Sequence, residues 1–215
     1  MLINLVGGDG SGKTTQITLL REWIEATFRV PVRLVSKGST FDRARFPEAE
    51  MWRLAYEEIA DRVVPLMPGE SRALFQVYLM ALAVGHYPPM PNEVVLADGY
   101  WIKNYATEVA LGIDPAWLRQ VGAFFPVPDV TLLLDVEPER VVGRGLTYKP
   151  YECGLAPECD HRSFIEYQRR VLGFLRELAI GEGWAVVDGR GTEAEVAAAI
   201  CGVLHGPLAA RFSNE

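Results

Sequence analysis

Short apolar segments alternate with longer amphipathic segments along most of the chain. Five apolar segments predict buried β-strands, at Leu2–Val6, Val32–Ser36, Glu93–Ala97, Asp129–Val136 and Trp184–Val187. Apolar residues at helical spacing predict helices between and after them, at Thr14–Phe28, Glu48–Val64, Glu70–His86, Trp101–Leu111, Pro115–Phe125, Pro138–Gly145, Phe164–Ile180 and Glu193–Leu204. Strands that are apolar on both faces and alternate with helices form a parallel sheet covered on both sides. The pattern therefore predicts a protein of the α/β class.

No linker, internal repeat or low-complexity segment interrupts this pattern. We therefore expect a single domain over residues 1–206, with an irregular segment at about residues 145–160 that contains two prolines and two cysteines. Residues 207–215 are expected to form a flexible tail.

Charge and composition exclude several classes of partner. The chain of 215 residues carries 28 acidic and 21 basic side chains, a formal net charge of −7, which disfavours a non-specific nucleic-acid binder and a polybasic membrane-surface protein. The longest apolar run, residues 77–85, is too short to span a bilayer, and the first residues show no basic leader or cleavage site, so we expect no membrane partner and no signal peptide. Three cysteines are an odd number and too few for a disulfide scaffold, which favours a reducing cytoplasm.

Residues 7–14, GGDGSGKT, match the pattern G-x-x-x-x-G-K-[ST] between the first predicted strand and the first predicted helix. Glycines let the backbone curl so that successive N–H groups point at phosphate oxygens, and the following helix adds its positive end. We expect Lys13 to reach the β- and γ-phosphates of a nucleotide and the Thr14 hydroxyl to bind Mg²⁺. The loop residues assigned to ATP are Gly8, Gly10, Ser11, Gly12, Lys13, Thr14 and Thr15.

A P-loop alone leaves GTPases, ATPase motors and small-molecule kinases open. Asp98 ends the third predicted strand, where its carboxylate can serve Mg²⁺ or accept a proton, although an aspartate there can also simply cap the next helix. Arg140 and Arg144 lead into the irregular segment, which as a lid would exclude water, although a solvated helix face would explain them too. No N-K-x-D signal typical of GTPases occurs. We therefore favour a kinase in which Lys13, Asp98 and Arg144 are catalytic and Arg140 binds ATP.

Three segments carry a resemblance to a known family. GGDGSGKTTQ (7–16), VVLADGY (94–100) and PDVTLLLDVEPERVVGR (128–144) resemble the P-loop, the D-R-Y segment and the P-D-L-T-x-x-L-D-V segment of thymidylate kinases. The order and spacing agree from about residue 2 to residue 204. The resemblance implies a P-loop kinase fold, with a five-stranded parallel sheet of order 2-3-1-4-5 and a lid. It also implies Mg²⁺-dependent transfer of the γ-phosphoryl group of ATP to a nucleoside monophosphate, and a homodimer, which is common in the family.

The same resemblance implies an acceptor site. Asp9 would lie near the acceptor sugar and the metal, the Phe75 ring would stack on the acceptor base, and Asn104 would make a polar contact with that base. Tyr100 of the D-G-Y segment and Lys37 complete the residues that we assign to acceptor binding.

The departures from the family pattern fall in this acceptor site. The arginine of D-R-Y is Gly99 here, and the T-R-E-P-G-G-T loop is replaced by residues 36–40, where Lys37 can substitute for the lost arginine only as a point charge. The D-R-A-Q segment becomes Tyr78–Ala81, so that its arginine is Leu79. Each lost charge-assisted contact is worth about 1.5–3 kcal/mol. The phosphate-donor half is thus intact and the acceptor half is changed, and we expect an acceptor other than dTMP or weak use of dTMP.

The sequence leaves the acceptor open. A modified pyrimidine nucleotide fits Phe75 and Asn104, whereas a hydroxyl of a modified base or nucleoside, including one within DNA, fits the loss of arginines. The net negative charge disfavours a long DNA track. A nucleotide-binding protein with little catalysis is a further alternative, against which the intact Lys13, Thr14 and Asp98 argue.

A second cluster of reactive residues lies in the irregular segment. Cys153, Cys159 and His161 have the spacing C-x5-C-x-H, which is not a standard zinc pattern and lacks an obvious fourth ligand. A zinc site stays open, but we expect free thiols in the lid.

Overall fold

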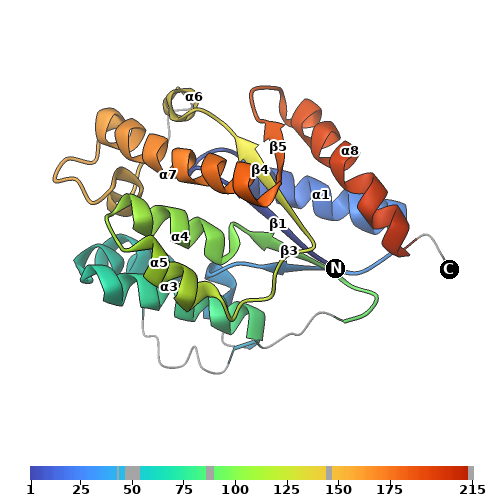
Figure 1. The fold of residues 1–215 in the computed structure, drawn as a ribbon, viewed down its shortest axis with the longest axis horizontal. Helices are drawn as coiled ribbons and strands as arrows, with labels where there is room; N and C mark the ends of the chain where they lie inside the picture. Colours follow the sequence, from blue (N-terminus) through green and yellow to red (C-terminus); the bar gives the residue numbers. More distant parts are fainter. Residues whose placement is uncertain (43, 47–53, 86–89, 144–146, 213–215) are drawn as a thin grey trace.

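The computed structural model describes residues 1–42, 44–46, 54–85, 90–143 and 147–212. Its centre is one parallel sheet of five strands in the order β2-β3-β1-β4-β5, as predicted (Figure 1). The strands are β1 (Leu2–Gly7), β2 (Val32–Val35), β3 (Val94–Asp98), β4 (Val130–Asp135) and β5 (Ala185–Asp188). Each strand consists largely of apolar residues, which suits a sheet buried on both faces.

Helices follow the strands along the chain. The longer ones are α1 (Lys13–Phe28), α3 (Gly69–Gly85), α4 (Tyr100–Ala110), α5 (Pro115–Gly122), α7 (His161–Glu182) and α8 (Glu193–Phe212). The shorter ones are η1 (Gly38–Phe41), α2 (Tyr56–Glu58), η3 (Ile59–Val63), η4 (Val64–Leu66), α6 (Pro138–Val142) and η5 (Pro150–Cys153). None of the helices in the described ranges has the length and apolar character that crossing a bilayer requires.

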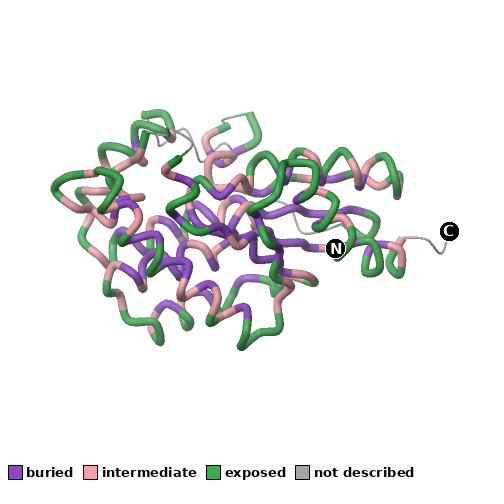
Figure 2. Tube along the Cα trace, turned by 90° about the horizontal axis from the view of Figure 1, so that it is seen from above, coloured by how far each residue is buried: buried purple, intermediate pink, exposed green. Residues whose placement is uncertain are grey.

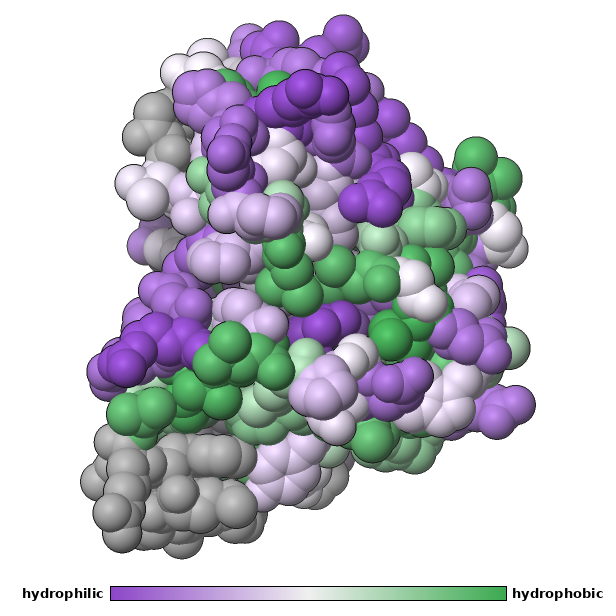
Figure 3. All heavy atoms as spheres, turned by 90° about the vertical axis from the view of Figure 1, so that its left-hand side faces the viewer, coloured by the Kyte–Doolittle hydropathy of each residue, from purple (hydrophilic) through white to green (hydrophobic). Residues whose placement is uncertain are grey.

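Two helical layers cover the sheet because the strands present alternate side chains to opposite faces. Ile3 and Leu5 of β1 pack with α1 and α8, whereas Val6 packs with α4 and α7. Buried residues follow the strands and the inner sides of these helices, and exposed residues follow their outer sides (Figure 2). At the end of the molecule that carries the start of α7, hydrophobic groups reach the surface beside strongly hydrophilic ones (Figure 3).

The long helix predicted at residues 48–64 is not formed as one continuous helix. Within the described residues this stretch folds as three short helical pieces, α2, η3 and η4. Pro65 lies in η4 and lacks the N–H that an α-helix would need. Residues 47–53 of the predicted helix lie outside the described residues.

The tail also differs from the expectation. The last helix does not stop at Leu204 but continues through Pro207 to Phe212, and only residues 213–215 fall outside the described chain. The reason is packing: Leu208 repeats the buried face of Ile200 and Leu204 one turn further on and is fully buried against the α1 side of the core.

The expectation of free lid thiols is wrong in this structure. Cys153 and Cys159 are joined by a disulfide, with their Cα atoms 5.4 Å apart, and Cys201 is the free cysteine. Gly154, with φ +68°, provides the left-handed turn that follows the first of the two cysteines. Within the described residues no cluster of three or more His, Cys, Asp or Glu side chains is placed to hold a metal. The disulfide also removes the cysteine count as an argument for a reducing compartment, so the cytoplasmic location stays a prediction.

Candidate active site

The P-loop lies at the carboxyl end of the central strand β1. Gly7 has no space for a side chain, because a Cβ there would lie 2.7 Å from the Leu134 carbonyl oxygen. Gly10 and Gly12 have φ angles of 71° and 100°, which glycine adopts without strain. The loop therefore curls as the motif predicts and delivers the chain into α1.

In and beside this loop, polar groups are left without a side-chain partner among the described residues. Gly12 begins α1 without a side-chain cap, so the first amides of a 16-residue helix point into the loop. The Ser11 hydroxyl is buried and has no hydrogen-bond partner among the described residues. The Lys13 ammonium crosses the loop and donates to the Gly8 carbonyl oxygen at 2.7 Å. Such a concentration of unpaired donors and positive charge fits a polyphosphate.

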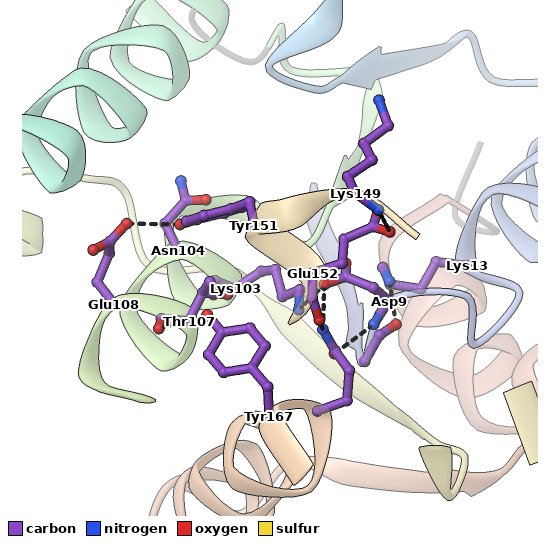
Figure 4. A network of polar contacts seen from close by, with 12 residues as sticks. Asp9, Lys13, Lys103, Asn104, Thr107, Glu108, Lys149, Tyr151, Glu152 and Tyr167 are labelled. Atoms are coloured by element: carbon purple, nitrogen blue, oxygen red, sulfur yellow. Dashed lines mark hydrogen bonds and ion pairs between the residues drawn. The ribbon is translucent and has the colours of Figure 1, made fainter. Parts of the chain in front are cut away.

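Beside the loop, Asp9 lies at the centre of a polar network (Figure 4). Its Oδ2 accepts hydrogen bonds from Lys103 Nζ at 3.1 Å and from Gln168 Nε2 at 2.9 Å, and its backbone N–H donates to Gln168 Oε1 at 3.0 Å. Burial by itself would raise the pKa of Asp9, but the ammonium groups of Lys103 and Lys13 outweigh it and bring the pKa to about 2. Asp9 is therefore a fixed negative charge that holds Lys103 against the P-loop.

A second polar cluster lies between η1, α3 and α4. The Lys37 ammonium donates to Gln76 Oε1 at 2.7 Å and to Asn104 Oδ1 at 2.8 Å. Burial lowers the pKa of Lys37 to about 8, against the opposing effect of Asp9. Asn104 is 4% exposed, and its Nδ2 donor has no partner among the described residues. This buried donor is available for an acceptor atom of a ligand.

The segment expected to form the lid contacts both α4 and α7. The Tyr151 hydroxyl donates to Glu108 Oε1 at 2.7 Å (Figure 4). Glu108 in turn accepts from the Arg72 guanidinium at 2.9–3.2 Å. The Glu152 carbonyl oxygen accepts from Gln168 Nε2 at 2.9 Å. Burial, and then the nearby Asp9 charge, raise the pKa of the Glu152 carboxyl. These contacts hold η5 over the Asp9 network.

Comparison with curated proteins found relatives that are named thymidylate kinases. The probable thymidylate kinase of Pyrococcus horikoshii is 33% identical over 183 residues, which cover 79% of this chain and 78% of the relative. The thymidylate kinase of Solidesulfovibrio magneticus is 30% identical over 215 aligned residues, which cover 95% of this chain and 98% of the relative. The chain belongs to the thymidylate kinase family. It is a P-loop nucleotide kinase, that is, a phosphotransferase, and no family model matches it.

Most of the residues assigned to the phosphate donor belong to the P-loop and the first turn of α1. Thr14 and Thr15 are exposed in the first turn of α1. Asp98 is the last residue of β3 and pairs in register with Leu5 of β1. Burial lowers the pKa of Lys13, and the negative charges of Asp9 and Asp98 act in the opposite direction. Arg140 extends from α6 to the Arg190 carbonyl oxygen at 3.1 Å, on the loop between β5 and α8. Arg144 lies outside the described residues.

The structure brings together three of the residues assigned to the acceptor. Asp9, Lys37 and Asn104 belong to the clusters described above, and Phe75 is half-buried on α3, one residue before Gln76. Tyr100 does not belong to them: it is 1% exposed, its ring packs on Phe125, and its hydroxyl donates to the Pro126 carbonyl oxygen at 3.1 Å. The assignment of Tyr100 to acceptor binding is therefore wrong, because the left-handed backbone at residues 99 and 100 turns the ring into the core.

Four residues of these polar networks were not predicted from the sequence; they are Gln76, Lys103, Glu152 and Gln168. The sequence contains a signal for one of these residues, Lys103. The chain has only four lysines, at positions 13, 37, 103 and 149, and three of them surround Asp9. Gln168 lies 159 positions from Asp9 and gives no signal in the sequence.

Proposed function

We propose that this kinase transfers the γ-phosphoryl group of ATP, with Mg²⁺, to a pyrimidine nucleoside monophosphate that is either dTMP or a modified form of it. One observation carries the proposal: the charges of the Asp9–Lys103 pair act both on the P-loop lysine, Lys13, and on Lys37, which bonds to Asn104. A donor triphosphate at one end and an acceptor base at the other suit such a site. The named activity of the relatives supports dTMP as the first acceptor to test.

On the donor side, the unpaired Ser11 hydroxyl, the helix amides and Lys13 fit the phosphates of ATP. The Thr14 hydroxyl and the Asp98 carboxylate would hold Mg²⁺, which neutralises charge on the transferred group. Lys13 stabilises the negative charge that develops during transfer, and we assign to Asp98 the acceptance of a proton from the acceptor phosphate. Arg140, and Arg144 by its place in the sequence, supply further positive charge.

On the acceptor side, a pyrimidine offers two carbonyl oxygens and a flat ring. Asn104 Nδ2 and the Lys37 ammonium are donors for a carbonyl oxygen, and Phe75 offers a ring for stacking. Leu79 stands where the family pattern has an arginine and is 1% exposed, so it offers no polar contact. A pyrimidine recognised here is therefore contacted mainly by Asn104 and Lys37.

The test is a transfer assay with γ-labelled ATP and a panel of dTMP, dUMP, a 5-hydroxymethyl form of dUMP, thymidine and DNA. We expect label in a nucleoside diphosphate, and a loss of at least about 100-fold in Lys13→Ala. Arg21→Ala, which removes an exposed cation paired with Glu25 on the same helix, is the matched control and should keep full activity.

Two results would contradict the proposal. Label in thymidine or DNA but in no monophosphate would identify a kinase of a nucleoside or base hydroxyl, the alternative favoured by Gly99 and Leu79. Binding of ATP without transfer to any acceptor would identify a nucleotide-binding protein with little catalysis.

A further inference from the structure

One lysine between the base cluster and the P-loop has no place in the family pattern. Lys103 lies on α4, its side chain is 12% exposed, and its Nζ is 3.1 Å from Asp9 Oδ2. In the close-up view its side chain extends from the side of Asn104 and Thr107 toward Asp9 and Lys13 (Figure 4). A nucleotide whose base lies at Asn104, and whose phosphate receives a group held at Lys13, must pass this position.

Lys103 and Gly99 depend on each other. A Cβ at Gly99 would lie 2.9 Å from the Cβ and 3.3 Å from the Cγ of Lys103, and Gly99 has a φ of +72°. An arginine at position 99 would therefore be strained and would displace the lysine. Glycine at position 99 leaves the space that the Lys103 stem fills. The family pattern has a positive charge at position 99, and this chain has one at Lys103, one helical turn further along α4.

The other lysines are committed elsewhere. The Lys37 ammonium bonds to Gln76 and Asn104 rather than to the Asp9 pair, and Lys13 crosses the P-loop. The Lys149 ammonium is 3.0 Å from the Asp61 carboxylate. These contacts assign Lys37 to the base cluster and do not support the expectation that Lys37 replaces the lost phosphate-binding arginine.

We propose that Lys103 binds the 5′-phosphate of the acceptor nucleotide; this assignment rests on the proposed function. An ammonium has three N–H donors, and the bond to Asp9 is the single hydrogen bond that Lys103 Nζ makes to the described residues. The other two donors can bond to phosphate oxygens without breaking that contact. Asp9, which is held by Gln168, fixes the position of the ammonium, and a point charge of this kind recognises a phosphate without the bidentate geometry of arginine.

The experiment is calorimetric binding of dTMP and of thymidine without ATP, to the wild type, Lys103→Met and Lys103→Gln. We expect the wild type to bind dTMP about 10- to 100-fold more tightly than thymidine, as one charge-assisted contact implies. Both variants should bind the two ligands equally, with an unchanged affinity for thymidine. Lys103→Gln keeps a hydrogen-bond donor for Asp9 and covers the case in which Lys103→Met does not fold. Arg21→Met, which removes a cation outside the site, should bind as the wild type does.

Three results would overturn the assignment. Equal binding of dTMP and thymidine by the wild type would mean that no residue of the site recognises the phosphate. Equal weakening of both ligands in the variants would show that Lys103 only neutralises Asp9. If the wild type bound neither dTMP nor thymidine, the protein would have no acceptor site of the proposed kind. A preference for dTMP that depends on Lys103, together with no transfer from ATP, would instead uphold Lys103 and refute the proposed function.

Discussion

The buried ion pair between α3 and α4 gives a sharp test of the structure. The side chains of Arg72 and Glu108 are 6% and 1% exposed, and two guanidinium nitrogens lie 2.9–3.2 Å from the carboxylate oxygens. The Tyr151 hydroxyl adds a third donor at 2.7 Å. The replacement Glu108→Gln keeps the shape of the side chain but leaves the Arg72 charge buried without a counter-charge. The Arg72 guanidinium stays charged even without this counter-charge, because an arginine side chain does not lose its proton in proteins.

Loss of one partner of a buried pair costs about 3–5 kcal/mol. That is a large part of the roughly 5–15 kcal/mol that stabilises a domain, and with a urea dependence of about 2 kcal/mol per M it shifts the midpoint by about 2 M. We expect this shift in urea unfolding followed by circular dichroism at pH 7. The double variant Arg72→Met/Glu108→Leu, which removes both charges, should recover most of the loss. Glu25→Gln, at the exposed pair on α1, should leave the midpoint unchanged.

A loss below about 1 kcal/mol in Glu108→Gln would refute the reasoning, because it would mean that water reaches the pair. Failure of the double variant to recover would show that the site needs the carboxylate itself, for instance to hold Tyr151. Tyr151→Phe separates these cases: it removes one hydrogen bond of about 1.5 kcal/mol and leaves the ion pair in place.

Three further predictions concern the base cluster, the disulfide and the last helix. Because burial lowers the pKa of Lys37 to about 8, its ammonium is lost as the pH rises through 8, and we expect the dissociation constant of dTMP to rise between pH 7 and 9, except in Lys37→Met. Folding stability should change in the opposite sense: the unfolded chain keeps this proton up to about pH 10.5, so this group makes the free energy of unfolding rise from pH 8 to 10.5. Thiol titration in denaturant should find one thiol, Cys201, before reduction and three afterwards, and reduction of Cys153–Cys159 should lower stability by about 2 kcal/mol for a loop of this size. Leu208→Ala should cost about 2–5 kcal/mol in urea unfolding, whereas a loose tail would show no change.

The sequence by itself determined the fold class, the P-loop and the family. These follow from local information: apolar runs make buried strands wherever they lie, and the glycines and lysine of the P-loop act within eight consecutive residues. The segment at 48–64 is the main local failure, since a helical pattern of side chains does not require one continuous helix when a proline lies beside it.

Tertiary structure decided which residues form the proposed acceptor half of the site. Residues 9, 37, 76, 103, 104 and 168 come from the P-loop, the position just before η1, α3, α4 and α7, and meet only after the sheet has formed. The sequence could show that an arginine was missing at Gly99, but not that Lys103 fills the space, because that depends on a 2.9 Å approach set by the backbone. The backbone conformation also explains why the Tyr100 ring is buried in the core and does not reach the site. The disulfide depends on a turn that brings the Cα atoms of Cys153 and Cys159 to 5.4 Å. Motifs that act through neighbouring residues can thus be read from the chain, whereas contacts between distant residues follow from the packing of its helices on the sheet.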